Sequence, residues 1–226
     1  MTVEYCLISS GTLSRNRLWG EGARVRTAHA TTTLVKGEGR LILVDPSLPA
    51  AVLAARFNER TGKHPKDVTD VFCTTLRPDH RRGIDAFGDA AWWTHEPELE
   101  AYRDRLKEMS DSASRLDADD KATLDADLDL LRRFRPAGEK FTDQIHLYPL
   151  PGPSPGSAGL LLTPATTTIL IAGDAALTAE HVLRGQVWEG CFDTEAAKES
   201  LRDMLQVADV LIPGHDNVFF PQRVWL

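Results

Sequence analysis

The sequence has few cysteines, no long apolar run and no basic excess, and each absence excludes a class of protein. Only three cysteines, Cys6, Cys73 and Cys191, occur in 226 residues. They are widely spaced and form no Cys-x-x-Cys pair, which argues against a zinc ribbon or a disulfide framework. We therefore expect reduced and mostly buried thiols, as in a cytoplasmic protein. No apolar run approaches the ~20 residues of a membrane-spanning helix.

The charge and the N-terminal residues narrow the expected partners further. A net charge of -7 argues against a nucleic-acid-binding surface, which is normally basic. The first six residues lack the basic region and apolar core of a signal peptide, so we expect no export. The expected partner is therefore a small-molecule substrate or ligand, with neither nucleic acid nor membrane, and the expected location is the cytoplasm.

Apolar segments separated by glycine, proline and polar residues predict two β-rich halves. We expect strands over 5–8, 33–35, 41–44, 68–74, 90–94, 144–148, 160–162, 168–172 and 210–212. Ser47 is expected to cap a helix that ends at Gly62, and Asp193 a last helix through Leu201 and Ala208. Because no linker or low-complexity stretch divides the chain, we predict one α/β (α+β) domain over 1–226, an αββα sandwich.

A helical insert is expected between the two halves, at about 97–135. Leu99, Tyr102, Leu106 and Met109 form one apolar stripe, and a second follows at i, i+4 and i+7 through Leu124, Leu128 and Leu131. Three roles are open for this insert: a solvated hairpin that covers core, a lid over the site, or the contact of a homodimer.

Polar residues follow three of the expected strands. The loops are Thr75-Leu76-Arg77-Pro78-Asp79-His80, Gly173-Asp174 and Pro213-Gly214-His215. Loops at strand ends can bring distant side chains together, and two Asp with two His are a common set of metal ligands. These loops therefore predict a metal site.

The order of these motifs resembles the metallo-β-lactamase-fold hydrolase superfamily. Its members carry His-x-His-x-Asp-His after a strand, then Pro-Gly-His-Thr-Pro-Gly-Ser, Gly-Asp and Pro-Gly-His. This chain has Thr75-x-Arg77-x-Asp79-His80 first, then Gly152-Pro153-Ser154-Pro155-Gly156-Ser157, and then the two later motifs. The likeness extends over most of the chain and implies the four-layer αββα fold.

The resemblance also implies which metal ligands survive. The first metal of the family takes three histidines, and their positions here are Thr75, Arg77 and Pro153, a vacated first metal site. The second metal takes residues that match Asp79, His80 and His215, and Asp174 matches the carboxylate that bridges the two metals. The resemblance thus implies at most one divalent metal, zinc before iron or manganese, or none, with Asp79 and Asp174 as the catalytic carboxylates.

Two charged residues near the motifs have alternative interpretations. Arg77 stays protonated at any working pH, so its guanidinium either replaces the missing metal charge beside Asp174 or Asp79, or extends into solvent. In the family, the residue at the position of Asp45 supports the metal ligands or the loop structure. The alternative is that Asp45 caps the turn that follows it.

Two further features complete the list of candidates. His181 and His95 could line the cleft from their loops, and we take His181 with Asp45 as a residue that supports the ligands. Gly152-Pro153-Ser154-Pro155-Gly156 matches the Gly-x-Ser-x-Gly elbow of serine hydrolases, but Pro155 has no N–H to serve as the oxyanion donor, so Ser154 is rejected as a nucleophile.

Two functions from different classes therefore remain. The first is a hydrolase of this superfamily that uses one metal and a degenerate active site. The second is an inactive relative that binds a ligand or partner. The loss of three ligands together favours the second, and the complete second ligand set favours the first. Metal analysis of the purified protein separates them.

Overall fold

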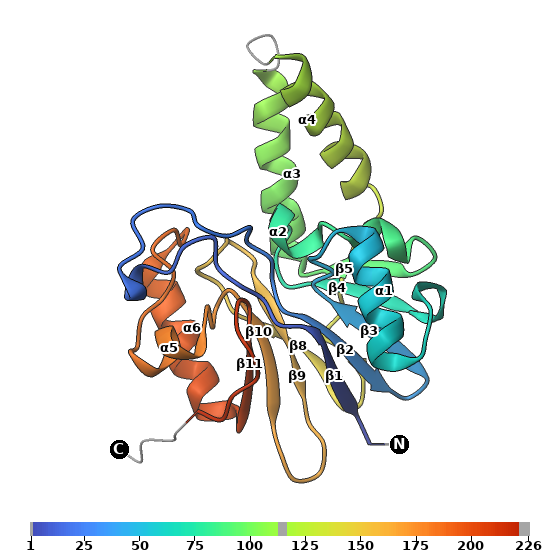
Figure 1. Ribbon diagram of the computed structural model, residues 1–226, viewed down its shortest axis with the longest axis vertical. Helices are drawn as coiled ribbons and strands as arrows, with labels where there is room; N and C mark the ends of the chain where they lie inside the picture. The colour runs from blue at the N-terminus through green and yellow to red at the C-terminus, as the bar shows by residue number, and fades with distance from the viewer. Residues whose placement is uncertain (1, 113–116, 222–226) are drawn as a thin grey trace.

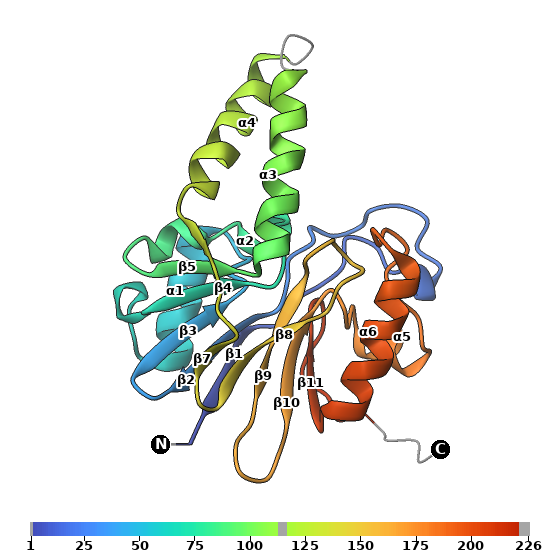
Figure 2. The same ribbon diagram turned by 180° about the vertical axis from the view of Figure 1, so that it is seen from behind.

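Two facing β-sheets form the centre of the protein, with helices on both outer sides (Figures 1 and 2). The computed structural model describes residues 2–112 and 117–221. The first sheet has the order β1-β2-β3-β4-β5-β6, and the second has the order β11-β10-β9-β8-β7. This is the αββα sandwich that the sequence predicted.

The first sheet changes from antiparallel to parallel pairing at β3. A tight hairpin joins β2 to β3, whereas β3, β4, β5 and β6 pair in parallel through crossovers. Parallel pairing aligns the carboxyl ends of these strands at one edge, where the 75–80 loop leaves β4. The strands are β1 (Glu4–Ser9), β2 (Thr32–Gly37), β3 (Arg40–Val44), β4 (Asp70–Cys73), β5 (Ala91–Thr94) and β6 (Phe134–Pro136).

The second sheet is antiparallel except for its last pair. β10 and β11 run parallel, with Ile169 opposite Val210 and Ile171 opposite Ile212, so the loops that follow them emerge side by side. The strands are β7 (Lys140–Thr142), β8 (Ile145–Pro149), β9 (Ala158–Leu162), β10 (Ile169–Gly173) and β11 (Val210–Pro213).

The alternation of side chains along the strands creates three apolar layers. In β4, Phe72 faces the second sheet, while Val71 and Cys73 pack under the helices of the first. In β10, Ile171 faces the first sheet and Leu170 packs under the helices of the second. Each fully buried Leu, Ile or Phe contributes about 1.5–3 kcal/mol relative to exposure, so these layers hold the loop ends in fixed positions.

Helices cover both outer faces. The sequence correctly predicted Asp193 as the cap of α6, because its carboxylate accepts hydrogen bonds from the N–H groups of Glu195 and Ala196. Ser47 was wrongly predicted as a cap: α1 begins after Pro49, and the Ser47 hydroxyl instead donates to the carbonyl of Ala30. The helices are α1 (Ala50–Thr61), α2 (Pro78–Arg81), α3 (Glu96–Asp111), α4 (Ala118–Leu131), α5 (Ala179–Leu183) and α6 (Thr194–Val207).

The predicted insert is an α3–α4 hairpin that projects from the body (Figure 1). Leu106 and Leu124 are buried, whereas Met109, nearer the tip, is 37% exposed, so the outer end of the first stripe packs less. The base is tied to α2 by Arg81, whose guanidinium donates to the Tyr102 hydroxyl at 2.9 Å and the Asp127 carboxylate at 2.7 Å. Among the described residues, no helix is both long and apolar enough to cross a membrane.

Candidate metal centre

The three polar loops meet at one edge of the sandwich. Asp174 follows β10 and His215 follows the parallel neighbour β11, and Asp79 and His80 come from the short helix α2 at the end of β4. Gly214 makes the close approach possible, because a Cβ there would lie 2.8 Å from the carbonyl carbon of Gly173 and 2.9 Å from Asp174 Oδ1. A side chain at this position would separate the two strand ends.

Two histidines point their ring nitrogens at Asp174. His80 Nε2 lies 3.2 Å and His215 Nε2 lies 3.1 Å from the same oxygen, Asp174 Oδ1. One ligand atom from each of Asp79, His80 and His215 lies within 4.8 Å of the others. Tetrahedral zinc holds nitrogen and oxygen ligands at 2.0–2.2 Å, which sets neighbouring ligand atoms about 3.3 Å apart, so these residues fit one metal ion.

Asp45 fixes the orientation of His80. Asp45 is buried, with 1% of the residue exposed. Its carboxylate accepts hydrogen bonds from the Thr74 N–H at 2.8 Å and from the Thr74 hydroxyl at 2.7 Å, and it lies 3.0 Å from His80 Nδ1. The φ of Asp45 is +49°, a conformation that costs about 1–3 kcal/mol for a residue other than glycine. Of the two roles predicted for Asp45, the structure shows the one that supports a candidate ligand.

Three of the four ring nitrogens of these histidines face only atoms that accept hydrogen bonds. His80 Nε2 faces Asp174, whereas its Nδ1 lies 3.0 Å from Asp45 Oδ2 and 3.3 Å from the Thr74 hydroxyl, which can also donate. His215 Nε2 faces Asp174, and its Nδ1 faces the carbonyl oxygens of Thr12 at 3.2 Å and His29 at 3.0 Å. A neutral imidazole carries only one N–H. A cation bound between the two Nε2 atoms and Asp174 would therefore let the single N–H of His215 point at the carbonyl oxygens.

The charge distribution in this cluster is strongly polarised. Burial disfavours the charged form of Asp174, but the charge of His80 and the hydrogen bond from His215 outweigh it and hold the pKa of Asp174 well below its ordinary value. Burial likewise lowers the pKa of His80, but Asp174 and Asp45 outweigh it and raise that pKa well above its ordinary value. Asp174 is therefore a buried carboxylate whose negative charge is stabilised by the positive groups around it.

Arg77 supplies a fixed cation on the other side of Asp174. Its Nη1 donates to Asp174 Oδ2 at 3.0 Å, and its Nη2 lies 3.4 Å from Asp79 Oδ2. The guanidinium carbon is also 4.1 Å from the centre of the Trp188 ring. Of the two orientations predicted for Arg77, the structure shows the one toward the carboxylates, and the alternative of extension into solvent is wrong.

Glu98 closes the region around Thr75 and Pro153. Its buried carboxylate accepts from the Thr75 hydroxyl at 2.7 Å and the Leu76 N–H at 2.9 Å. On its other oxygen it accepts from the Ser154 hydroxyl at 2.6 Å and the Gly156 N–H at 3.3 Å. The Thr75 and Ser154 hydroxyls are thus committed to Glu98.

Glu98 and Trp188 were missed in the sequence analysis. Glu98 lies four residues before Tyr102 and eight before Leu106, so it stands on the apolar side of α3, and a carboxylate in an apolar stripe was the available signal. Trp188 belongs to the irregular segment between α5 and α6, where no periodic pattern indicates its position.

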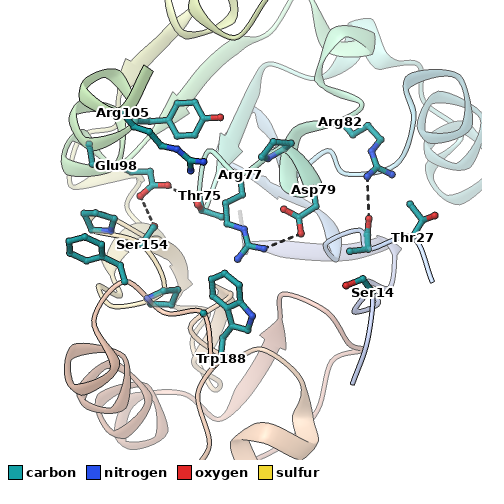
Figure 3. Close-up of a pocket in the computed structure, with 18 of the residues that line it drawn as sticks. Ser14, Thr27, Thr75, Arg77, Asp79, Arg82, Glu98, Arg105, Ser154 and Trp188 are labelled. Carbon is teal, nitrogen blue, oxygen red and sulfur yellow. Dashed lines mark hydrogen bonds and ion pairs between the residues drawn. The ribbon is translucent and has the colours of Figure 1, made fainter. Parts of the chain in front are cut away.

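Two cavities adjoin the cluster. The larger, of about 930 Å³, is lined by Thr75, Arg77, Asp79, Glu98 and Trp188 among others (Figure 3). The second, of about 570 Å³, also reaches Arg77, Asp79 and Trp188 and adds His181 and His215. The cluster is therefore accessible to a small molecule from the larger cavity through Asp79 and Arg77.

The remaining histidine candidates lie outside the cluster. His181 lines the second cavity, but its Nδ1 lies 2.7 Å from the Thr178 hydroxyl, and burial lowers its pKa. His95 Nδ1 lies 2.9 Å from the Gly156 carbonyl. Neither histidine is joined by a hydrogen bond to Asp79, His80, Asp174 or His215 among the described residues.

An αββα sandwich with His and Asp side chains gathered at its strand ends is typical of a class of metal-dependent hydrolases. A sequence profile of the metallo-β-lactamase superfamily matches residues 26–215. The chain belongs to the metallo-β-lactamase superfamily, as its motif order predicted. No curated protein matches the chain in sequence.

Solved structures share the fold at low sequence identity. A candidate metallo-β-lactamase from Thermotoga maritima is 17% identical, with a TM-score of 0.73, and the match covers 98% of this chain and 100% of that one. The dizinc quorum-quenching lactonase AidC is 18% identical with a TM-score of 0.68, covering 88% and 76%. An N-acyl homoserine lactone hydrolase, with its product at the catalytic metal centre, is 19% identical with a TM-score of 0.66, covering 96% and 94%.

Proposed function

We propose that this protein is a hydrolase of the superfamily that works with a single divalent metal, zinc before iron or manganese. The ligands are Asp79, His80, His215 and Asp174. The observation that carries the proposal is that His80 Nε2 and His215 Nε2 lie 3.2 Å and 3.1 Å from the same oxygen of Asp174, while the other ring nitrogen of His215 faces only carbonyl oxygens, so one cation between the two Nε2 atoms and Asp174 would suit all three groups.

The remaining residues have roles that follow from their contacts. A divalent ion in this position would supply a Lewis acid and lower the pKa of a bound water. Asp174 remains a carboxylate and can hold the ion together with the two histidines, and Asp79, which lines both cavities, is the carboxylate that a reacting group in the cleft can reach. Arg77 holds Asp174 and Asp79 in place and keeps N–H donors directed at the cavity it lines, where they can stabilise negative charge on a substrate oxygen.

The region of Thr75, Arg77 and Pro153 does not fit a second metal. None of these three side chains is a usual metal ligand, and the Arg77 guanidinium brings a positive charge to the carboxylate that would bridge two ions. Glu98, the nearest carboxylate, already accepts four hydrogen bonds from the protein.

The test is elemental analysis of protein purified without chelator, followed by zinc titration. We expect one tightly bound equivalent, and two tight equivalents or none would contradict the proposal. Because two neighbours are named as lactone hydrolases, ring opening of N-acyl homoserine lactones is the first reaction to assay. Loss of any hydrolysis on chelation, with recovery on adding one equivalent of zinc, is the expected result.

A metal-free binding protein is the second candidate. The Arg77–Asp174 contact favours it, because an arginine balances the buried carboxylate without any ion. In that case zinc at ten equivalents leaves the thermal midpoint unchanged. A rise in the midpoint at one equivalent, as linkage requires for a ligand of the folded state, would exclude this candidate.

A further inference from the structure

The larger cavity carries positive charge in a protein that is otherwise acidic. Five arginines and two carboxylates line it, whereas the whole chain has a net charge of -7. Both carboxylates are already engaged, Asp79 by Arg77 and Glu98 by four protein donors. The excess positive charge therefore faces the cavity without an acidic counterpart in its wall. The arginines are Arg24, Arg26, Arg77, Arg82 and Arg105.

The five guanidinium groups differ in how many of their N–H donors already have a partner in the protein. Arg77 is held by Asp174, Asp79 and Trp188. Arg26 is paired with Glu21 and also donates to the Leu13 carbonyl. Arg82 makes one long hydrogen bond, 3.4 Å, to the Ala28 carbonyl.

Arg24 and Arg105 have no hydrogen-bond or ion-pair partner in the described part of the chain. Arg24 comes from the N-terminal loop and Arg105 from α3, so two separate segments each contribute an unused guanidinium to one cavity. Figure 3 shows Arg105 extending into the pocket beside Glu98. Guanidinium groups present paired N–H donors that match carboxylate and phosphate oxygens.

The same cavity is also lined by aromatic side chains. Trp188 stacks on Arg77, and Phe192 is 72% exposed at the same cavity, although a side chain of its size is usually buried. A cavity with free guanidinium groups and an apolar wall is complementary to a molecule with a charged head and an apolar body.

We infer that this cavity binds an organic anion whose carboxylate or phosphate group pairs with Arg24 and Arg105 and whose apolar body packs on Trp188 and Phe192. The inference deepens the proposed function by naming the substrate class of the same site. That the anion is hydrolysed rests on the proposed function, whereas binding of the anion does not. The anion enters beside Asp79 and Arg77, at the opening of the metal centre.

Calorimetric titration with four probes tests the inference: octyl phosphate, octanoate, methyl octanoate as the neutral control, and inorganic phosphate. We expect binding of at least one of the two amphiphilic anions, weaker binding of inorganic phosphate and none of the ester. The tighter of the two anions identifies the head group. The combined variant Arg24→Gln with Arg105→Gln should raise its Kd at least tenfold, and added salt should reduce this difference.

Arg103→Gln is the matched control, because Arg103 is an exposed arginine on α3 that does not line the cavity. It should leave the Kd unchanged. Equal binding of ester and anion, no anion binding up to millimolar concentration, or an Arg103 effect as large as that of the double variant would overturn the inference. All titrations are run on zinc-loaded and chelator-treated protein with metal content measured, so failure of the one-metal proposal is recorded separately from failure of anion binding.

Discussion

The two sides of Asp174 show two ways of balancing a buried carboxylate. On one side, His80 and His215 direct ring nitrogens at one oxygen of Asp174, and the other ring nitrogen of His215 faces only carbonyl oxygens, so a cation can be accommodated between the rings and the carboxylate. On the other side, Arg77 donates to Asp174 and Glu98 closes the region of Thr75 and Ser154. Every contact on this second side is made by the protein itself.

The difference teaches that a position without metal ligands can still be filled by charged groups of the protein. Replacing metal-binding histidines by any neutral residue would leave Asp174 and Asp79 with excess negative charge in a buried place, which is costly. Arginine at position 77 offsets that charge, and the Glu98 carboxylate accepts from the donors that surround Thr75. The arginine side is therefore satisfied by the protein alone, and the histidine side is the one on which the proposed metal would bind.

The largest effect is expected from a change on the histidine side. His215→Ala removes one ligand and should weaken zinc binding at least about 100-fold, since loss of residues that only support ligands already costs 10–100-fold. Unfolding free energy without metal should change far less, because the apolar layers do not depend on an ion. Competition with a chromophoric chelator measures the affinity. His146→Ala is the control, and equal affinity of both variants would show that His215 is not a ligand.

A change on the arginine side should affect stability and leave metal affinity intact. Glu98→Gln keeps the shape but leaves the Gly156 N–H facing an amide NH₂, and should lower the unfolding free energy by about 1–3 kcal/mol. Urea denaturation measures it, with Glu100→Gln, an exposed glutamate of the same helix, as control. A fall in zinc affinity of the Glu98 variant would show that the two sides are not separate.

Arg77 lies between the two sides and should affect both by smaller amounts. Arg77→Ala removes the ion pair to Asp174 and should cost about 1–2 kcal/mol, since the arginine side chain is 29% exposed. Because a cation is removed from beside the site, zinc should bind the variant more tightly. Arg77→His should still bind one zinc, since Thr75 and Pro153 offer no ligand; a second tight equivalent in that variant would refute the ligand assignment.

The ion pair between Asp70 and Arg40 offers a comparison away from the candidate metal centre. Burial raises its pKa, but hydrogen bonds from Arg40, Thr69 and Trp93 outweigh burial, and the folded-state pKa lies below the ordinary value. The stability it contributes is therefore present above the unfolded-state pKa, near 4, and is lost as pH falls through the folded-state value. Urea denaturation from pH 6 to pH 3 measures the unfolding free energy at each pH, and in Asp70→Asn this free energy should fall less steeply as the pH is lowered. An unchanged dependence on pH would show that Asp70 does not contribute this stability.

The elements that carry the metal centre could be predicted from the sequence because each is local. The apolar runs before Thr75, Asp174 and His215 are strands, and motif order placed their ends together. For Arg77 the sequence left two orientations open, and charge favours the one toward the carboxylates, which the structure shows.

Glu98, Trp188 and Arg105 could not be placed in the same way. They reach the site from α3 and from an irregular segment, and their positions depend on how the hairpin and the 184–193 loop pack on the body. The Ser47 cap failed for a related reason. Its hydroxyl bonds to the Ala30 carbonyl, and that contact, between residues 17 apart in sequence, prevails over local capping.

Arg81 makes the helical hairpin an integral part of the body rather than a detachable module. It is 6% exposed and shares its donors among Leu76, Tyr102 and Asp127, one partner in the site loop and two in the hairpin. Replacing residues 97–135 by a short linker would remove two of these partners and leave a buried guanidinium, together with the loss of Glu98. Cutting the helical arm away would therefore also disturb the loop that carries Asp79 and His80, which Arg81 joins to the arm.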